Sequence, residues 1–157
     1  MSLSKFEQFG YINEEELKPT IEDFLKIPLI KTDRYNKFDF IDTGGDIYVE
    51  LKSRSFESSK YDTVFLSKDK YNFIQNLLTT SPTSTIYLFY KFTDKLMYLK
   101  FDLQKMINNE YIVMNGTDAN AYPKINFYNH KYNKNIVQNY YLYLSHFEKV
   151  NKKKNKI

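Results

Sequence analysis

Two adjacent glycines, Gly44 and Gly45, constrain the fold of this chain more than any other short stretch. Residues 35–42 and 46–53 on either side have the aromatic, β-branched composition of strands. Gly-Gly supplies the positive φ that a tight hairpin turn requires. The sequence therefore predicts an antiparallel hairpin over residues 35–53.

A second tight turn, Thr93-Asp94, joins a continuous apolar run at 85–91 to another strand pattern at 95–101. Apolar residues at the helical period predict helices, and further strands are expected towards the C-terminus. The predicted helices cover 13–27 (N-cap Asn13), 67–79 (cap Ser67) and 102–109 (cap Asp102), and the additional strands lie around 124–129 and 136–144. This order predicts an α/β protein of the α+β kind, with a central mixed β-sheet flanked by helices. Two strand pairs joined by tight turns exclude a doubly wound parallel sheet.

The length of 157 residues predicts one domain, residues 1–148, followed by a basic tail at 149–157. The tail holds five lysines and no acid, and we expect a solvated, disordered end. No cysteine is present, which excludes disulfides, thiolate nucleophiles and cysteine zinc sites. Without an apolar run of roughly 20 residues or an apolar signal core, the expected location is intracellular. The bias towards Lys, Asn, Tyr, Ile and Phe favours an AT-rich genome such as that of a virus, a mobile element or a low-GC microbe.

The net charge of +4 is unevenly distributed along the chain. Residues 1–50 carry 11 acidic and 6 basic groups, whereas residues 51–148 carry 8 acidic and 12 basic groups. An acidic segment can hold a cation and basic surroundings can hold a polyanion.

The first hairpin places three chemically useful side chains close together. Strand alternation sends Val49 and Leu51 into the core and sends Glu50 and Lys52 to the opposite face. Asp39 lies across the Gly-Gly turn on the neighbouring segment. Two carboxylates suit Mg²⁺, which prefers oxygen ligands, and an adjacent ammonium can stabilise negative charge that develops on a phosphate. The pattern therefore favours metal-dependent phosphodiester hydrolysis.

Asp39 followed by Glu50-Leu51-Lys52 at the end of a hairpin, after an acidic helix, resembles the PD-(D/E)xK nuclease superfamily over roughly residues 13–91. The resemblance implies a restriction-endonuclease-like core that hydrolyses DNA with Mg²⁺ or Mn²⁺. It gives Asp39 and Glu50 as metal ligands and Lys52 as the residue that serves the attacking water. It also implies a metal ligand in the Leu51 carbonyl and a glutamate from the first helix. For that glutamate we expect Glu22, with Glu16 second, and Phe38 stands where the family has proline.

Several other side chains are candidates for function. The expected contacts to a phosphate backbone are Arg54, Lys60, Lys68 and Lys70. For Arg54 and Lys60 an exposed basic loop is an equally good explanation, whereas lysines at the start of a helix oppose its dipole, which mildly favours a ligand-facing role. Asp42 and Asp46 flank the turn and fit turn formation better than metal binding. His130 and His146 lack metal-site spacing and are interpreted as structural.

Three interpretations therefore remain at this point. The first is a DNA endonuclease of viral, mobile-element or repair and recombination type, acting alone or as a homodimer with one site for each strand. The second is a catalytically inactive nuclease-fold module that binds nucleic acid, DNA before RNA, or a protein assembly. The third is a structural or interaction protein in which the charged hairpin is ordinary surface.

Overall fold

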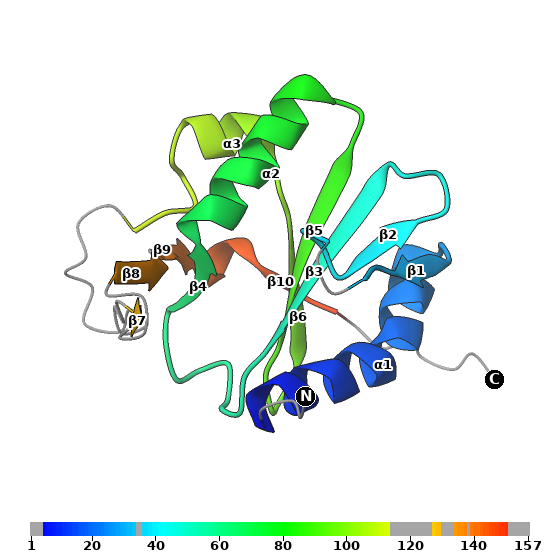
Figure 1. Ribbon diagram of the computed structural model, residues 1–157, viewed down its shortest axis with the longest axis horizontal. Coiled ribbons are helices and arrows are strands. Elements are labelled where there is room, and N and C mark those ends of the chain that lie inside the picture. Colours follow the sequence, from blue (N-terminus) through cyan, green and yellow to red (C-terminus); the bar gives the residue numbers. More distant parts are fainter. Residues whose placement is uncertain (1–4, 34–35, 114–126, 130–133, 138, 151–157) are drawn as a thin grey trace. The chain divides into compact units, whose positions relative to one another are not determined.

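The computed structural model describes residues 5–33, 36–113, 127–129, 134–137 and 139–150. The chain divides into two compact units (Figure 1). The first comprises Met1–Glu57, Thr85–Lys100 and Glu148–Ile157, and the second comprises Ser58–Ser84 and Phe101–Phe147.

A six-stranded mixed sheet forms the first unit, in the order β1-β2-β3-β5-β6-β10. All neighbours pair antiparallel except β3 and β5, which are parallel. The strands are β1 (Leu29–Lys31), β2 (Phe40–Asp42), β3 (Ile47–Ser53), β5 (Thr85–Lys91), β6 (Leu96–Lys100) and β10 (Glu148–Lys149). The predicted mixed sheet and both predicted hairpins, β2–β3 and β5–β6, are confirmed.

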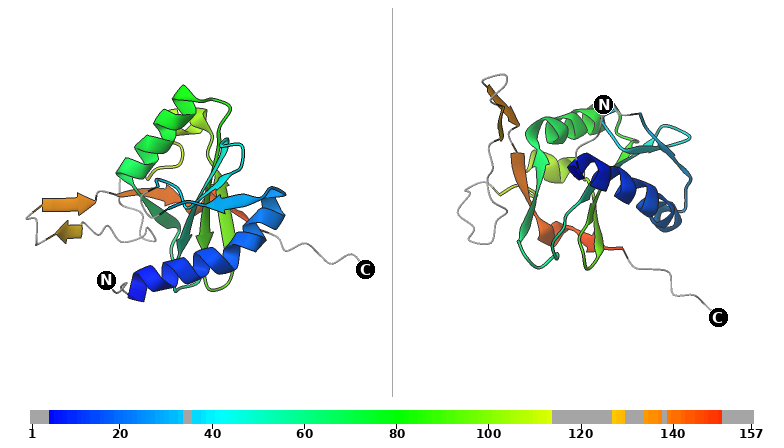
Figure 2. Two further views of the ribbon diagram at one scale, coloured as in Figure 1. Left: turned by 45° about the vertical axis from the view of Figure 1, so that its right-hand side comes forward. Right: turned by 60° about the horizontal axis from the view of Figure 1, so that its bottom comes forward.

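Helix α1 (Lys5–Leu25) packs its apolar stripe against one face of this sheet (Figure 2). Ile21 is fully buried among strand residues, and the Phe24 ring contacts Phe89 and Tyr98. The strand residues that share this core are Leu29, Phe40, Val49, Leu51, Phe89 and Leu96, together with Val150. The helix therefore fixes the face of β3 that carries Val49 and Leu51, as strand alternation predicted.

The helix begins earlier than the sequence suggested. Asn13 was expected as the N-cap, yet α1 starts at Lys5 and continues through Asn13 and Pro19. The cap signal at Asn13 is overridden because the chain before it continues as helix. The helix ends at Leu25, where Lys26 adopts a left-handed φ of 58° and Ile27 N–H donates to the Glu22 carbonyl.

The second unit combines helices with short antiparallel strand pairs. Strand β4 (Thr63–Ser67) pairs with β9 (Asn139–Tyr143), and β7 (Phe127–Asn129) pairs with β8 (Lys134–Val137). The predicted caps are confirmed, since Ser67 accepts from Lys70 N–H at the start of α2 (Lys68–Thr80) and Asp102 accepts from Lys105 N–H at the start of α3 (Leu103–Ile107). A 3-10 helix, Leu144–His146, completes the unit.

The C-terminal end of the described chain belongs to the sheet. Lys149, which the sequence assigned to the tail, lies in β10 opposite Met97, and Tyr98 O–H donates to Glu148 at 2.5 Å. Val150 is buried in the core, and its N–H donates to the Leu96 carbonyl. Residues 151–157, the rest of the predicted tail, lie outside the described residues.

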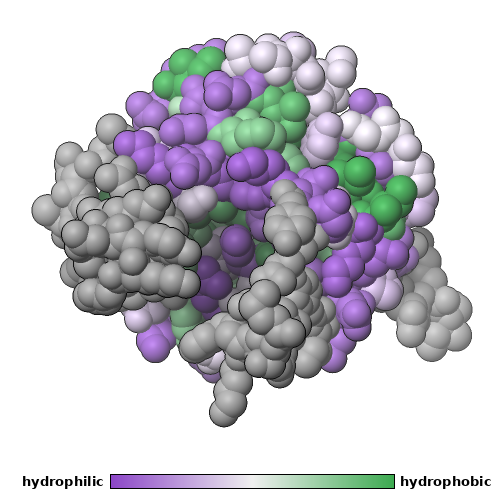
Figure 3. All heavy atoms as spheres, in the orientation of Figure 1, coloured by the Kyte–Doolittle hydropathy of each residue, from purple (hydrophilic) through white to green (hydrophobic). Residues whose placement is uncertain are grey.

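The face of the molecule drawn in Figure 3 is mostly hydrophilic, with separate hydrophobic areas. Among the described residues the large hydrophobic side chains that are exposed are Ile30, Phe73 and Ile107. None of the described helices has the length and apolar character needed to cross a membrane.

The role of Val150 can be tested by unfolding. Val150→Ala removes two buried methyl groups, so we expect the free energy of unfolding to fall by about 1.5 kcal/mol. Urea denaturation followed by circular dichroism measures the change. The control Lys149→Ala, at an exposed neighbouring position, is expected to change stability by less than about 0.5 kcal/mol. Equal, small effects of the two substitutions would contradict the burial of Val150.

Candidate active site

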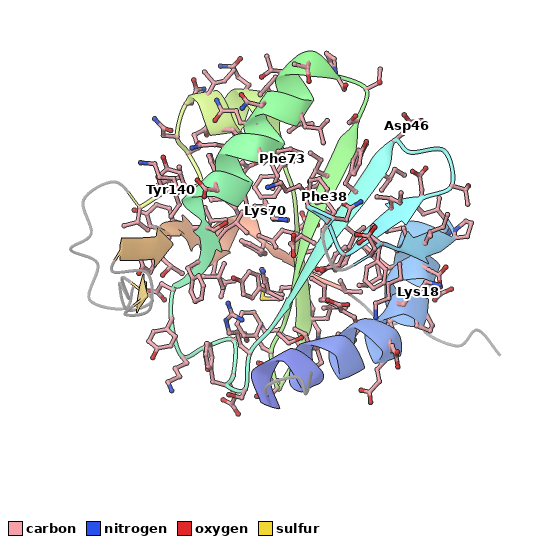
Figure 4. All side chains as sticks on the ribbon, in the orientation of Figure 1. Lys18, Phe38, Asp46, Lys70, Phe73 and Tyr140 are labelled. Carbon is pink, nitrogen blue, oxygen red and sulfur yellow. The ribbon has the colours of Figure 1, made fainter. Side chains whose placement is uncertain are left out.

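The turn between β2 and β3 is built by Asp42 and Gly45. The Asp42 carboxylate accepts hydrogen bonds from the N–H groups of Asp46 and Ile47, at 2.8 and 2.9 Å. Gly45 has φ +74°, a conformation that side chains other than glycine rarely adopt. Asp42 is thus committed to the turn, and Asp46 lies exposed at its tip (Figure 4). The turn fixes the register that brings Asp39 next to β3.

Asp39 lies directly before β2 and is held from two sides. Its N–H donates to the Val49 carbonyl at 3.0 Å, and its carbonyl accepts from Thr32 N–H at 3.0 Å. Its carboxylate Oδ2 accepts from Leu51 N–H at 2.7 Å. The carboxylate is therefore aimed at the segment of β3 that contains Glu50, Leu51 and Lys52.

The residue before Asp39 supports this placement. Phe38, labelled in Figure 4, is buried, and its ring lies 5.0 Å from the ring of Tyr48 on β3. Its N–H donates to the side chain of Asn36. A large apolar side chain thus packs the segment ahead of Asp39 against the hairpin, at the position where the superfamily pattern has proline.

Glu50 is buried, with only 4% of its surface exposed, although it lies on the face of β3 opposite the α1 core. Its carboxyl group hydrogen-bonds Asp39, and its Oε1 lies 3.6 Å from Lys52 Nζ. Lys52 keeps about a third of its side chain exposed. The structure thus brings Asp39, Glu50 and Lys52 together, with Lys52 at the accessible side.

The two carboxyl groups oppose one another's ionisation, because two negative charges this close repel. Burial raises the pKa of Asp39 to about 9, with further increases from the charge of Glu50 and from their shared hydrogen bond. The Leu51 N–H lowers this pKa, because it stabilises the carboxylate form. Without a cation the pair therefore retains a proton near neutral pH, and a bound divalent cation would take the place of that proton.

The Leu51 backbone faces the same pair. In a strand, the N–H and the carbonyl of one residue point towards the same edge, and the Leu51 N–H points to Asp39. The Leu51 carbonyl is therefore directed to the edge where the two carboxyl groups meet. In the part of the chain that the structure describes, no group of three or more His, Asp, Glu or Cys side chains is arranged to hold a metal ion. The available set is two carboxylates and a carbonyl, which matches the oxygen ligands of Mg²⁺.

Helix α1 contributes a glutamate that the sequence did not single out. The charge of Glu14 raises the pKa of Asp39, and its carboxylate lies 3.7 Å from Lys31 Nζ. Glu14 precedes Leu17 and Ile21 at three- and seven-residue spacings, which places it on the buried stripe of the helix. This spacing was the available signal, but it was hidden because the helix was expected to begin at Asn13.

Glu22, the expected helix glutamate, is held at the other end of α1. It accepts a hydrogen bond from Leu29 N–H at 2.8 Å and lies 3.9 Å from Lys18 Nζ, one turn away. These contacts stabilise the connection from α1 to β1. Glu16, the second choice, is exposed. No interaction of either side chain with Asp39 is found among those resolved for the described residues.

The expected phosphate contacts fall in both units. Arg54 follows β3 in the first unit, with its guanidinium carbon 5.2 Å from the centre of the Tyr90 ring. Lys60, Lys68 and Lys70 belong to the second unit. There Lys68 Nζ lies 5.6 Å from the centre of the Tyr140 ring, and Lys60 Nζ lies at the same distance from that of Tyr61.

One of the two histidines, His146, lies among the described residues. His146, in the second unit, packs edge-on against the Tyr111 ring at 5.1 Å, as expected of a structural residue. His130 lies outside the described residues.

The raised pKa of Asp39 gives a signed prediction for the metal-free protein. A folded-state pKa above the ordinary value adds stability at low pH, and this contribution is lost as pH rises towards 9. Asp39→Asn fixes the neutral form and keeps an acceptor for Leu51 N–H. We therefore expect its melting temperature in EDTA to exceed that of the wild type by a margin that grows from pH 5 to pH 8.

The limiting slope for a single group is about 1.4 kcal/mol per pH unit. Asp46→Asn, at the exposed tip of the turn, is the matched control and should show no such growth. A difference between Asp39→Asn and the wild type that stays constant with pH would contradict the shared proton.

Comparison with known proteins places this geometry in a family. The sequence matches the protein family described as "Phage putative PDDEXK endonuclease" over residues 5–119, a span that includes Glu14, Asp39, Glu50 and Lys52. No curated protein sequence matches the chain. The match confirms the resemblance and the restriction-endonuclease-like fold, and it indicates a nuclease. This chain belongs to the phage PDDEXK endonuclease family.

Proposed function

We propose that this protein is a Mg²⁺- or Mn²⁺-dependent endonuclease that hydrolyses DNA phosphodiester bonds at the Asp39–Glu50 pair. The observation that carries the proposal is the arrangement of three side chains: Glu50 is buried, Asp39 accepts a hydrogen bond from Leu51 N–H at 2.7 Å, and Lys52 Nζ lies 3.6 Å from Glu50 Oε1. Membership of a phage endonuclease family supports the nucleic-acid substrate and the endonucleolytic mode. DNA is proposed over RNA because the PD-(D/E)xK superfamily that the motif resembles acts mainly on DNA.

The residues that would hold the cation are Asp39, Glu50 and the carbonyl of Leu51. When bound, the ion supplies Lewis-acid polarisation of the phosphoryl oxygen and a lowered pKa for bound water. Asp39 is oriented for this role by Leu51 N–H, and Glu50 is oriented by its fixed place on β3.

Lys52 has the position and charge to act on the nucleophile. Its ammonium lies beside Glu50 but remains partly exposed, so it can reach both a water molecule and a substrate phosphate. From there it orients the attacking water and stabilises the negative charge that develops on the phosphoryl oxygens in the transition state.

Glu14 is proposed as the helix carboxylate of the site, in place of Glu22. It is the α1 residue whose charge is felt by Asp39, and its side chain is largely buried. Its Lys31 partner neutralises it when no cation is present. Glu14 therefore adds negative potential beside Asp39, which would favour a cation bound there.

Cleavage assays test the function directly. We expect supercoiled DNA to be nicked or linearised in Mg²⁺ or Mn²⁺ and to stay intact in EDTA. Lys52→Ala should lower the rate by about 100-fold or more, since removing one transition-state donor has that effect in other enzymes. Asp39→Asn and Glu50→Gln should be at least as damaging. Asp46→Asn, purified in the same way, should cleave at the wild-type rate.

Two outcomes would count against the proposal. Activity that persists in Lys52→Ala and Glu50→Gln would show that the site lies elsewhere or that a contaminant cleaves. Absence of cleavage with supercoiled, linear and branched DNA and with RNA, under both metals, would instead favour an inactive nuclease-fold module that binds nucleic acid. Faster cleavage of RNA than of DNA would identify RNA, in place of DNA, as the substrate.

The choice between the two helix glutamates is tested by metal titration. Glu14→Gln should raise the Mn²⁺ concentration required for half-maximal cleavage by about tenfold, the effect expected of a second-layer carboxylate. Glu22→Gln should leave that concentration unchanged and lower the melting temperature, because its carboxylate binds Leu29 N–H. Glu15→Gln, at an exposed position of the same helix, is the control. A shift in metal requirement for Glu22→Gln alone would restore Glu22 as the site residue.

A further inference from the structure

The face of β3 that carries Glu50 and Lys52 continues to a third charged residue, Arg54. Arg54 N–H donates to the Lys91 carbonyl at 2.8 Å, which extends the parallel β3–β5 ladder by one residue past its last pair. Alternation therefore keeps Arg54 on the same face as Lys52. The rise of a strand separates successive residues on one face by about 7 Å.

The Arg54 side chain is fixed by an aromatic support. Its guanidinium lies over the Tyr90 ring at 5.2 Å, and its two terminal nitrogens donate to the Ser53 carbonyl at 2.8 Å and to the Tyr90 hydroxyl at 3.5 Å. Tyr90 is fully buried and stacks on Phe92 at 5.8 Å. This guanidinium therefore has a well-defined position in the first unit.

The loop that follows Arg54 is anchored as well. Thr93 N–H donates to the Phe56 carbonyl at 3.1 Å, and the Phe56 ring packs against Phe92 at 6.1 Å. Both contacts tie the loop to the β5–β6 hairpin. Arg54 is thus held through its backbone as well as its side chain, and little conformational freedom remains to be lost when it binds a ligand.

We propose that Arg54 binds the backbone phosphate next to the scissile one and so sets the register of the cleaved strand. This inference rests on the proposed function, because the scissile phosphate is placed by Asp39, Glu50 and Lys52. The spacing of Lys52 and Arg54 along one face is comparable to that of successive phosphates along a nucleic-acid strand. A guanidinium has five donors in a planar fork, so it can keep its protein contacts and bind phosphate oxygens in the same plane.

The residue type of Arg54 favours binding of a phosphate over the role at the breaking bond that we assign to Lys52. Lysine is a flexible point charge that suits a moving water or a developing charge, whereas a stacked arginine suits a phosphate of fixed geometry. Strand β3 therefore separates the two tasks. Lys52 acts at the bond that breaks, and Arg54 holds the neighbouring nucleotide.

The test measures DNA binding and cleavage with Arg54→Met, which keeps an unbranched side chain on the Tyr90 ring but removes the charge. Binding of a labelled 20-mer duplex is measured in EDTA over a range of salt concentrations. We expect Arg54→Met to weaken binding by about tenfold. The slope of log Kd against log salt should fall by about 0.9, the value for the loss of one phosphate contact.

Two further variants separate charge from structure. Arg54→Lys should keep the salt slope, because the charge remains, but should bind less tightly than the wild type because the fork is lost. Lys100→Ala, at an exposed position on β6, should leave both quantities close to wild type. Urea midpoints of all variants show whether Arg54→Met is folded, and if it is not, Arg54→Lys and Tyr90→Leu carry the same comparison. Tyr90→Leu should weaken binding without changing the slope.

Cleavage assays locate the phosphate that Arg54 contacts. In an oligonucleotide with a mapped cleavage site, each phosphate is replaced in turn by a neutral methylphosphonate. One replacement adjacent to the scissile bond should lower kcat/KM by about tenfold in the wild type and have no further effect in Arg54→Met. Equal sensitivity of both proteins at every position would overturn the inference, as would an unchanged salt slope in Arg54→Met.

The outcomes for the two proposals are distinct. Normal cleavage with an unchanged salt slope in Arg54→Met would overturn the role of Arg54 and leave the nuclease function standing. A reduced slope in a protein that cleaves no substrate would overturn the nuclease function and retain Arg54 as a phosphate-binding residue.

Discussion

The rest of the candidate site depends on two neighbouring carboxyl groups, the buried Glu50 and the partly buried Asp39. Like charges in a poorly solvated place repel, so burial and the charge of Glu50 together raise the pKa of Asp39 to about 9. The fold tolerates this cost because the Asp42 turn and the β3–β5 ladder fix the backbone on both sides. A divalent cation offers the neutralisation that the protein side chains supply only in part through Lys52.

The same arrangement links stability to function. A hairpin selected for stability alone would place an apolar residue at Glu50, since the position is almost fully covered. Instead the chain keeps an acid there and adds Leu51 N–H, which favours the charged form of its neighbour Asp39. The hydrogen bond acts against protonation while burial acts for it. If the site binds a metal ion as we propose, that ion replaces a proton, and the metal-free protein carries the cost in stability.

The sequence predicts the centre of this arrangement because short-range rules govern it. Gly44 and Gly45 require a tight turn, and strand alternation then places Glu50 and Lys52 on one face. The sequence did not predict β1 or β10, which have three and two residues and are too short to show the alternation of a strand. Glu14 was missed for a related reason: the capping signal at Asn13 placed the helix start too close to it, so its place on the buried stripe was not apparent. Long-range pairing, such as that of Val150 with β6, has no local signal.

One strand thus carries most of the chemistry that we assign to this protein. From Glu50 to Arg54, β3 and its extension present an acid, a carbonyl, an ammonium and a guanidinium in chain order, and the rise of the strand fixes their spacing. Both neighbours of β3 in the sheet are needed, because β2 brings Asp39 to one edge and β5 supplies Tyr90 to support Arg54. A slip of one residue in the β2–β3 pairing would put Asp39 and Glu50 on opposite faces, and a slip in the β3–β5 pairing would take Tyr90 away from Arg54. The register of β3 against β2 and β5 is therefore the property of the fold on which both the proposed metal binding and the proposed substrate placement depend.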